Sequence, residues 1–180
     1  PSGWGKTTLL RILMGLESPT AGTVQGAGRV SAVFQEDRLC PQLNAVQNVT
    51  LVLPGAEIQY KTQITKDFQR IGMDKTVLSL PARKLSGGQK RRTALLRALW
   101  AEADTLLLDE PFTGMDPETM QKAAALLKER CAGCPAFWRP TTGRPSSSWA
   151  GRCWNWTTCK KNRKPLCRPE KSERHRGCWL

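Results

Sequence analysis

The chain has 180 residues, of which 39% are hydrophobic and 24% are charged, and these values suit one soluble globular domain with a sizeable core. No run of about eighteen apolar residues occurs, which excludes a membrane-spanning helix. The net charge of +13 does not mark the whole chain as a nucleic-acid binder, because residues 1–130 hold 17 basic and 13 acidic residues, whereas residues 131–180 hold 11 and 2.

Helix and strand patterns alternate over the first 130 residues, as in an α/β protein with a parallel sheet. The expected elements, in chain order, are a glycine-containing turn over 1–8, a helix over 7–16, a strand over 29–35, helical segments within 44–73 that break at Pro54-Gly55, a helix over 87–101, a buried strand over 105–108, and a helix over 118–130. Asp116 is the expected N-cap of the last helix, with Pro117 in its first turn.

The turn at the start of the chain has the composition of a phosphate-binding loop. It reads PSGWGKTT, which is the motif G-x-x-x-x-G-K-[ST] without its opening glycine. Backbone N–H groups of such a loop cradle phosphate oxygens at the positive end of the following helix. Lys6 is expected on the β- and γ-phosphates and the Thr7 hydroxyl on Mg²⁺. The predicted nucleotide-binding residues here are Ser2, Gly3, Trp4, Gly5, Lys6, Thr7 and Thr8; the alternative is an ordinary glycine-rich turn.

The strand over 105–108 runs into two carboxylates. An aspartate at the carboxyl end of a buried strand can bind the Mg²⁺ that the phosphate loop also holds, and Asp109 fits that role. The adjacent Glu110 is the candidate general base that polarises the attacking water. Acidic residues after a strand are common, so this feature alone also fits an ordinary turn.

A third motif, LSGGQ, covers residues 85–89 just ahead of the acidic strand. Serine and two glycines at the start of a helix make a second anion site. With the phosphate loop, a Val-Phe-Gln segment ending at Gln35, LSGGQ and the acidic strand in this order, residues 1–130 resemble the ATP-binding cassette (ABC) family. The resemblance implies a P-loop NTPase core with a parallel sheet and a small helical subdomain at about residues 40–90.

The same resemblance implies roles for the remaining motif residues. Gln35 would be the Q-loop glutamine that reaches Mg²⁺ and water and couples to a membrane permease; a solvated glutamine is the alternative. Residues 113–116 resemble the D-loop. In a head-to-tail dimer with a second ABC ATPase subunit, the signature would meet the γ-phosphate held by the partner's phosphate loop. The signature residues expected to do so are Ser86, Gly87, Gly88 and Gln89.

The function implied is ATP hydrolysis, with ATP and Mg²⁺, that powers solute transport by a membrane permease. The run VFQEDRL over 33–39 resembles importers of nitrate, sulfonate or taurine type. We expect a cytoplasmic protein, peripheral to the inner face of the cell membrane, with no specific nucleic-acid partner. Three alternatives stay open: a non-catalytic fragment of such a subunit, an ABC ATPase of DNA repair or translation, and a basic nucleic-acid-binding module.

Several family parts are missing from the sequence. The first phosphate-loop glycine and the adenine-stacking aromatic residue would lie before Pro1, so we expect the natural N-terminus to precede Pro1. The family also has a switch histidine at the end of an apolar strand after the acidic one. The one histidine here, His175, lies in a charged stretch without such a pattern and is not expected to fill that role.

Residues 131–180 hold six of the seven cysteines and five of the seven tryptophans. Their apolar residues follow neither the helix period nor the strand period, so we expect an aberrant, irregular and disordered tail. A one-base shift of frame over 137–157 forces the sequence Leu-Glu-Leu-Asp and permits Thr-His-Asp, the switch motif, which predicts a frame slip between 131 and 136; a genuine basic extension is the alternative. Cys131 and Cys134 have the spacing of a metal pair, but no second pair completes a zinc ribbon.

Overall fold

The computed structural model describes residues 6–24, 28–131 and 136–139. Its elements, in chain order, are α1 (Lys6–Leu13), β1 (Val30–Val33), α2 (Ala45–Thr50), α3 (Glu57–Arg70), α4 (Lys75–Leu78), the 3₁₀-helix η1 (Ala82–Lys84), α5 (Gly87–Trp100), β2 (Thr105–Asp109), α6 (Pro117–Arg130) and β3 (Ala136–Arg139). The phosphate-loop residues Ser2, Gly3, Trp4 and Gly5 lie outside the described residues, as does His175.

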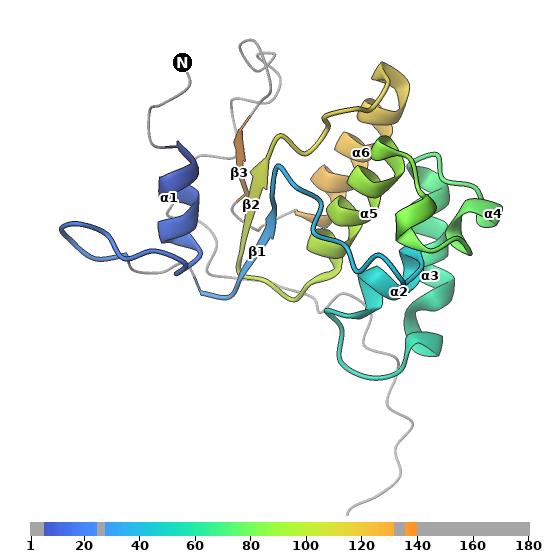
Figure 1. Ribbon diagram of the computed structural model, residues 1–180, viewed down its shortest axis with the longest axis horizontal. Coiled ribbons are helices and arrows are strands. Elements are labelled where there is room, and N and C mark those ends of the chain that lie inside the picture. The colour runs from blue at the N-terminus through green and yellow to red at the C-terminus, as the bar shows by residue number, and fades with distance from the viewer. Residues whose placement is uncertain (1–5, 25–27, 132–135, 140–180) are drawn as a thin grey trace, which may run out of the picture.

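The described strands form one parallel sheet in the order β1-β2-β3. Val30 pairs with Thr105 at the start of the β1–β2 ladder, and Leu106 pairs with Ala136 at the start of the β2–β3 ladder. All five residues of β2 are buried. This burial follows from the layers in Figure 1, where α1 lies on one side of the sheet and α5 and α6 lie on the other. The predicted α/β fold with a parallel sheet is therefore confirmed.

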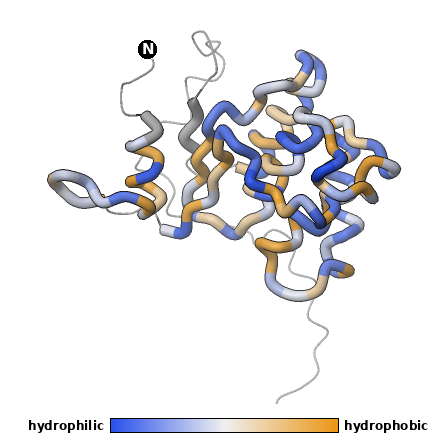
Figure 2. The backbone as a smooth tube through the Cα atoms, in the orientation of Figure 1, coloured by the Kyte–Doolittle hydropathy of each residue, from blue (hydrophilic) through white to orange (hydrophobic). Residues whose placement is uncertain are grey.

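The helices beyond the sheet share one hydrophobic core with it. Helix α5 contacts β1, α2, α3 and α6, so it links the sheet to the other helices. Figure 2 shows hydrophobic segments along β1 and β2. Side chains of fully buried residues fill the space between the helices; they include Ile64, Phe68, Ile71, Leu95, Leu96 and Leu126. Among the residues that the structure describes, every helix is too short or too polar to cross a membrane.

Local sequence signals set most of the helix ends. Asn44 begins α2 with a capping box, in which its side chain accepts the Gln47 N–H at 2.9 Å and the Gln47 side chain accepts the Asn44 N–H at 3.1 Å. The predicted break before α3 is present, with Gly55 at a φ of +93°. Asp116 caps α6 as predicted, because its Oδ1 accepts the Thr119 N–H at 2.9 Å.

The structure differs from the sequence expectations at two places. Helix α1 ends at Leu13 rather than near Leu16, because Gly15 takes a φ of +71° and the Leu16 N–H donates to the Arg11 carbonyl, a Schellman ending. The other difference is β3, a strand in the segment that was expected to be irregular. Pairing with β2 supplies the order that the sequence pattern of residues 136–139 does not indicate. Residues 140–180 lie outside the described part of the chain.

Candidate nucleotide site

The carboxyl edge of the sheet brings the predicted site elements together. The strands run toward the same edge, and Figure 1 shows the N-terminal end of α1 at that edge. Lys6 and Thr7 belong to the first turn of α1, although their side chains lie outside the described part, and Thr8 is exposed. The unpaired N–H groups of a helix start favour an anion there. In open parallel sheets ligands bind outside the carboxyl ends of the strands, so this edge is the candidate nucleotide site.

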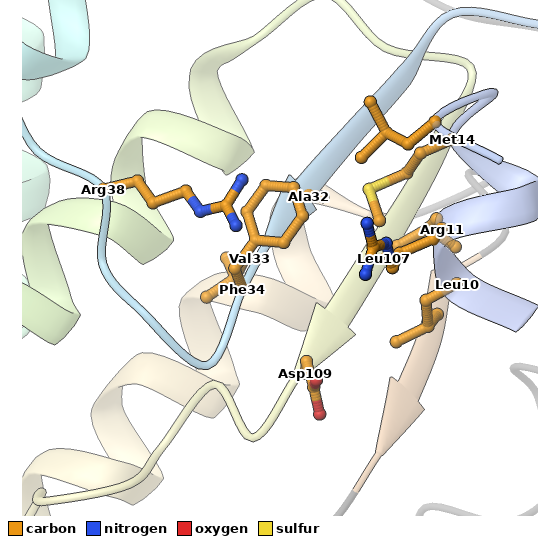
Figure 3. Close-up of a pocket in the computed structure, with 10 residues that line it drawn as sticks. Leu10, Arg11, Met14, Ala32, Val33, Phe34, Arg38, Leu107 and Asp109 are labelled. Atoms are coloured by element: carbon orange, nitrogen blue, oxygen red, sulfur yellow. The ribbon is translucent and has the colours of Figure 1, made fainter. Parts of the chain in front are cut away.

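A cavity of about 200 Å³ lies between α1 and the sheet, and Asp109 is its one carboxylate among the described residues. Figure 3 shows Asp109 at the carboxyl end of β2, with Leu10, Arg11 and Met14 on the facing side of α1. The lining residues are Leu10, Arg11, Met14, Leu16, Ala32, Val33, Phe34, Arg38, Leu107 and Asp109. Asp109 is 6% exposed, and this burial strengthens its interaction with any cation at the site.

The turn after β2 holds Glu110 in a special conformation. Its φ is +51°, a left-handed value that is uncommon outside glycine and that recurs at functional sites. The Thr113 hydroxyl donates to Glu110 Oε2 at 3.3 Å, and the Thr113 N–H donates to the Glu110 carbonyl at 3.3 Å. The first residue of the predicted D-loop therefore contacts both the side chain and the backbone of the candidate general base.

The LSGGQ signature forms the N-terminus of α5. Leu85 is buried and anchors the motif, whereas Ser86 and Gly87 are exposed. Ser86 Oγ accepts the Gln89 N–H at 3.3 Å, and Gln89 Oε1 accepts the Ser86 N–H at 2.9 Å, so these two residues form a capping box that was not predicted. The exposed start of the helix still presents N–H groups to an anion from outside the chain.

Gly88 is the signature residue with the closest packing. A Cβ at this position would lie 2.8 Å from the Gly114 carbonyl oxygen, whereas a Cβ at Gly87 would meet nothing within 4 Å. The second signature glycine therefore allows the start of α5 to approach the predicted D-loop.

This packing predicts different outcomes for alanine at the two signature glycines. Gly88→Ala is expected to lower the free energy of unfolding by about 1–3 kcal/mol, because the new methyl group must displace the Gly114 backbone. Gly87→Ala is the matched control, and it is expected to leave stability unchanged or to raise it by up to about 1 kcal/mol through helix propensity. Urea denaturation of both variants measures the difference; equal destabilisation would contradict the packing account.

Gln35 lies on the segment that follows β1. Gln35 is exposed, and its backbone carbonyl accepts a hydrogen bond from Arg91 Nη1 at 3.3 Å. The preceding Phe34 lies under the Arg38 guanidinium, whose carbon is 4.3 Å from the ring centroid. The structure thus places Gln35 next to the carboxyl edge of the sheet, beside the end of β2 but with its side chain in solvent.

Arg91 is the residue at the site that sequence reasoning missed. It is 3% exposed and its guanidinium lies between the Gln35 segment and the end of β2. One sequence signal could have found it: Arg91 shares a face of α5 with Leu95 and Ala98, at helical spacing, so a charged residue stands where burial is expected. A buried arginine requires partners, and such a position therefore marks a buried polar cluster.

The parallel sheet, the helix start after a glycine-lysine-threonine loop, the acidic strand end and the LSGGQ helix define an ATP-binding cassette. The chain belongs to the ABC transporter family, whose model matches residues 1–113.

Curated relatives are import ATP-binding proteins, which confirms the importer-type resemblance. The chain is 43% identical over 130 residues to the aliphatic sulfonates import ATP-binding protein SsuB 1 of Frankia alni, covering 72% of this chain and 48% of that protein. It is 38% identical over 145 residues to the thiamine import ATP-binding protein ThiQ of Salmonella typhimurium, covering 73% and 61%. The chain therefore spans about half to three-fifths of the length of these relatives.

Solved structures agree on the fold. The dimeric bacterial ABC transporter cassette MJ0796 superposes with a TM-score of 0.69 at 25% identity, covering 79% of this chain and 72% of that one. The RNase-L inhibitor superposes with a TM-score of 0.63 at 24% identity, covering 77% of this chain and 27% of that one. These similarities show that the described part of the chain has the P-loop NTPase fold of ABC cassettes.

Proposed function

We propose that this chain is the ATP-binding part of an importer subunit that hydrolyses ATP to power solute uptake through a membrane permease. The observation that carries the proposal is the convergence of the start of α1, Asp109 and Glu110 at one edge of the sheet. Residues 1–130 would form the cassette, with the helical subdomain at about 40–90. The import relatives support a peripheral position at the inner face of the cell membrane.

The residues at this edge fit Mg²⁺ and a nucleotide triphosphate. Mg²⁺ prefers hard oxygen ligands and is commonly held by one or two carboxylates together with substrate phosphates. Asp109, the Thr7 hydroxyl and the Gln35 side-chain oxygen are such ligands. Among the described residues, no group of three or more His, Cys, Asp or Glu side chains could hold a metal ion. When bound, the ion would neutralise phosphate charge.

The residues of the chain divide the work of phosphoryl transfer. The phosphate-loop residues Ser2 to Thr8 would bind the phosphates, with Lys6 as the point charge. Glu110, held at the end of β2, would accept a proton from the attacking water, and Gln35 would orient that water. Electrostatic positioning carries most of such a reaction, so the fixed orientation of these groups matters more than any single bond.

The signature would complete the site of a second subunit. Figure 1 shows α1 and α5 on opposite sides of the sheet, an arrangement that favours a role for Ser86 to Gln89 toward another chain. The dimeric cassette among the structural relatives supports a head-to-tail dimer. We further propose a solute of the sulfonate, taurine or nitrate type, on the strength of the sulfonate-importer relatives, and no specific nucleic-acid partner.

Phosphate release from ATP by the purified full chain tests this function. We expect turnover that requires Mg²⁺ and stops with EDTA. Turnover should fall at least a hundredfold in Lys6→Ala, because the variant lacks the ammonium group expected to contact the transferred phosphoryl group. Lys75→Ala, on the exposed surface of α4, is the control for a lost lysine and is expected to keep wild-type turnover. Absent turnover in the wild-type chain would instead support the non-catalytic alternative.

A further inference from the structure

We propose that Arg91 is a positioning residue that couples the Q-loop segment, residues 34–38, to the backbone of Glu110. The inference rests on the proposed function for its catalytic consequence, but the coupling itself is a property of the described residues. Arg91 lies in the second turn of α5, and its guanidinium contacts both segments at once.

On the Q-loop side, Arg91 has three acceptors. Its Nη1 donates to the Phe34 carbonyl, to the Gln35 carbonyl at 3.3 Å and to Asp37 Oδ1 at 3.2 Å. The Asp37 contact is also the one ion pair of Arg91 among the described residues, and the Asp37 side chain is 24% exposed. The Q-loop segment is therefore tied to the Nη1 edge of the guanidinium.

On the other side, the same guanidinium holds the end of β2. Nη2 donates to the Asp109 carbonyl at 2.6 Å and to the Glu110 carbonyl at 2.5 Å, and Nε donates to the Glu110 carbonyl at 3.1 Å. These bonds fix both peptide planes that flank the left-handed Glu110. Because charge-assisted bonds are stronger than neutral ones, they can hold a conformation that a non-glycine residue otherwise disfavours.

The rigidity of arginine makes the two sides dependent on each other. The guanidinium is planar with its donors in a fixed fork, so a shift of the acceptors at one end reorients the donors at the other. At 3% exposure no water replaces a lost acceptor cheaply, and the group must follow its partners. The Thr113 N–H shares the Glu110 carbonyl with Arg91, so a shift of that carbonyl also reaches the predicted D-loop.

Arg97 shows what a one-sided contact looks like on the same helix. Its guanidinium donates to the Arg38 carbonyl at 2.8 Å and to the Asp37 carbonyl at 3.0 Å. Both of these acceptors belong to residues 34–38, so these two bonds stabilise the Q-loop segment alone. The two-sided arrangement is therefore specific to Arg91 among these two arginines.

Amide hydrogen exchange in the full chain, measured by NMR, tests the coupling. Asp37→Asn weakens only the Q-loop side of Arg91, and we expect exchange of the Thr113 amide to rise by about tenfold. Glu36→Gln is the matched control, because Glu36 is 83% exposed and pairs with Arg38 rather than with Arg91. In an Arg91→Lys background, Asp37→Asn should have no further effect on Thr113.

The outcomes separate the coupling from the proposed function. A rise confined to residues 34–38, equal effects of Glu36→Gln and Asp37→Asn, or additive effects in the Arg91→Lys background would each overturn the coupling. With an active wild-type chain, Asp37→Asn should lower kcat severalfold with KM for ATP unchanged, and an unchanged kcat would overturn the positioning role. A wild-type chain without ATP turnover would remove the proposed function, while the exchange data would still decide the coupling.

Discussion

Replacing Glu110 with glutamine is expected to lower ATP turnover by about 10²–10⁴-fold while Mg·ATP binding persists. Glutamine keeps the shape of the side chain and an oxygen for the Thr113 hydroxyl, but it accepts no proton from the attacking water. Asp109 and the phosphate loop are unchanged in this variant, so affinity for the nucleotide should be retained.

Phosphate release and equilibrium binding of Mg·ATP together measure this effect. Glu118→Gln serves as the control, because Glu118 lies in the first turn of α6 and pairs with Lys122 at 2.6 Å on the surface. Its turnover should equal that of the wild-type chain. If Glu110→Gln hydrolysed ATP at the wild-type rate, Glu110 would not be the general base.

The largest expected effect on stability comes from Asp67, a fully buried carboxylate that joins three helices. Its Oδ2 accepts from Trp100 Nε1 at 3.0 Å at the end of α5 and from Arg130 at the end of α6. Arg130 also lies over the Trp100 ring, at 4.7 Å. Asp67→Ala is expected to lower the free energy of unfolding by about 3–5 kcal/mol, because it leaves the Arg130 side chain, which is only 9% exposed, without this partner.

Urea denaturation of the full chain measures that loss. Glu129→Gln is the control, because Glu129 pairs with Arg70 at the exposed side of the same cluster and surface ion pairs contribute little. The account predicts a much smaller change for Glu129→Gln than for Asp67→Ala. Similar losses in the two variants would show that burial of the Asp67 pair is not what matters.

The contribution of Asp67 to the stability of the fold should depend on pH. Burial raises the pKa of this carboxyl above its ordinary value of 3.8, although the charge of Arg130, the Trp100 N–H and Arg70 act in the opposite direction. A raised folded-state pKa means that the folded chain binds the proton of Asp67 more tightly than the unfolded chain does. The protonation of Asp67 therefore stabilises the fold fully below pH 3.8. This contribution is lost as the pH rises through the folded-state pKa. The stability of the wild-type chain relative to Asp67→Asn should therefore fall as the pH is raised from that range.

Local patterns were sufficient to predict most of the fold. The apolar run of β2, the proline and N-cap of α6 and the glycine break before α3 each act within a few residues, and each element lies close to where it was expected. The end of α1 was missed because the left-handed Gly15 outweighed the apolar spacing. Strand β3 was missed because its order comes from pairing with β2 across 29 intervening positions, as in Leu106 with Ala136.

The candidate site was predictable where a motif has a fixed spacing, and not where distant segments meet. Asp109 and Glu110 stand at the end of β2 as the motif requires, and Gln35 lies beside them. The contacts of Arg91 with residues 34–37 and 109–110, and the approach of Gly88 to Gly114, depend on the fold rather than on spacing. No periodicity in one helix can reveal acceptors that lie on two other segments.

A complementation experiment tests most directly whether the phosphate loop of one chain and the signature of another form one nucleotide site. Lys6→Ala and Ser86→Arg, each in the Glu110→Gln background, are mixed with Mg·ATP and examined by sedimentation velocity. We expect each variant alone to remain monomeric, and the mixture to form a dimer, because it alone has one site with an intact loop and an intact signature. A mixture that stays monomeric while the Glu110→Gln chain itself dimerises with Mg·ATP, or a Glu110→Gln chain that binds no ATP at all, would contradict the account.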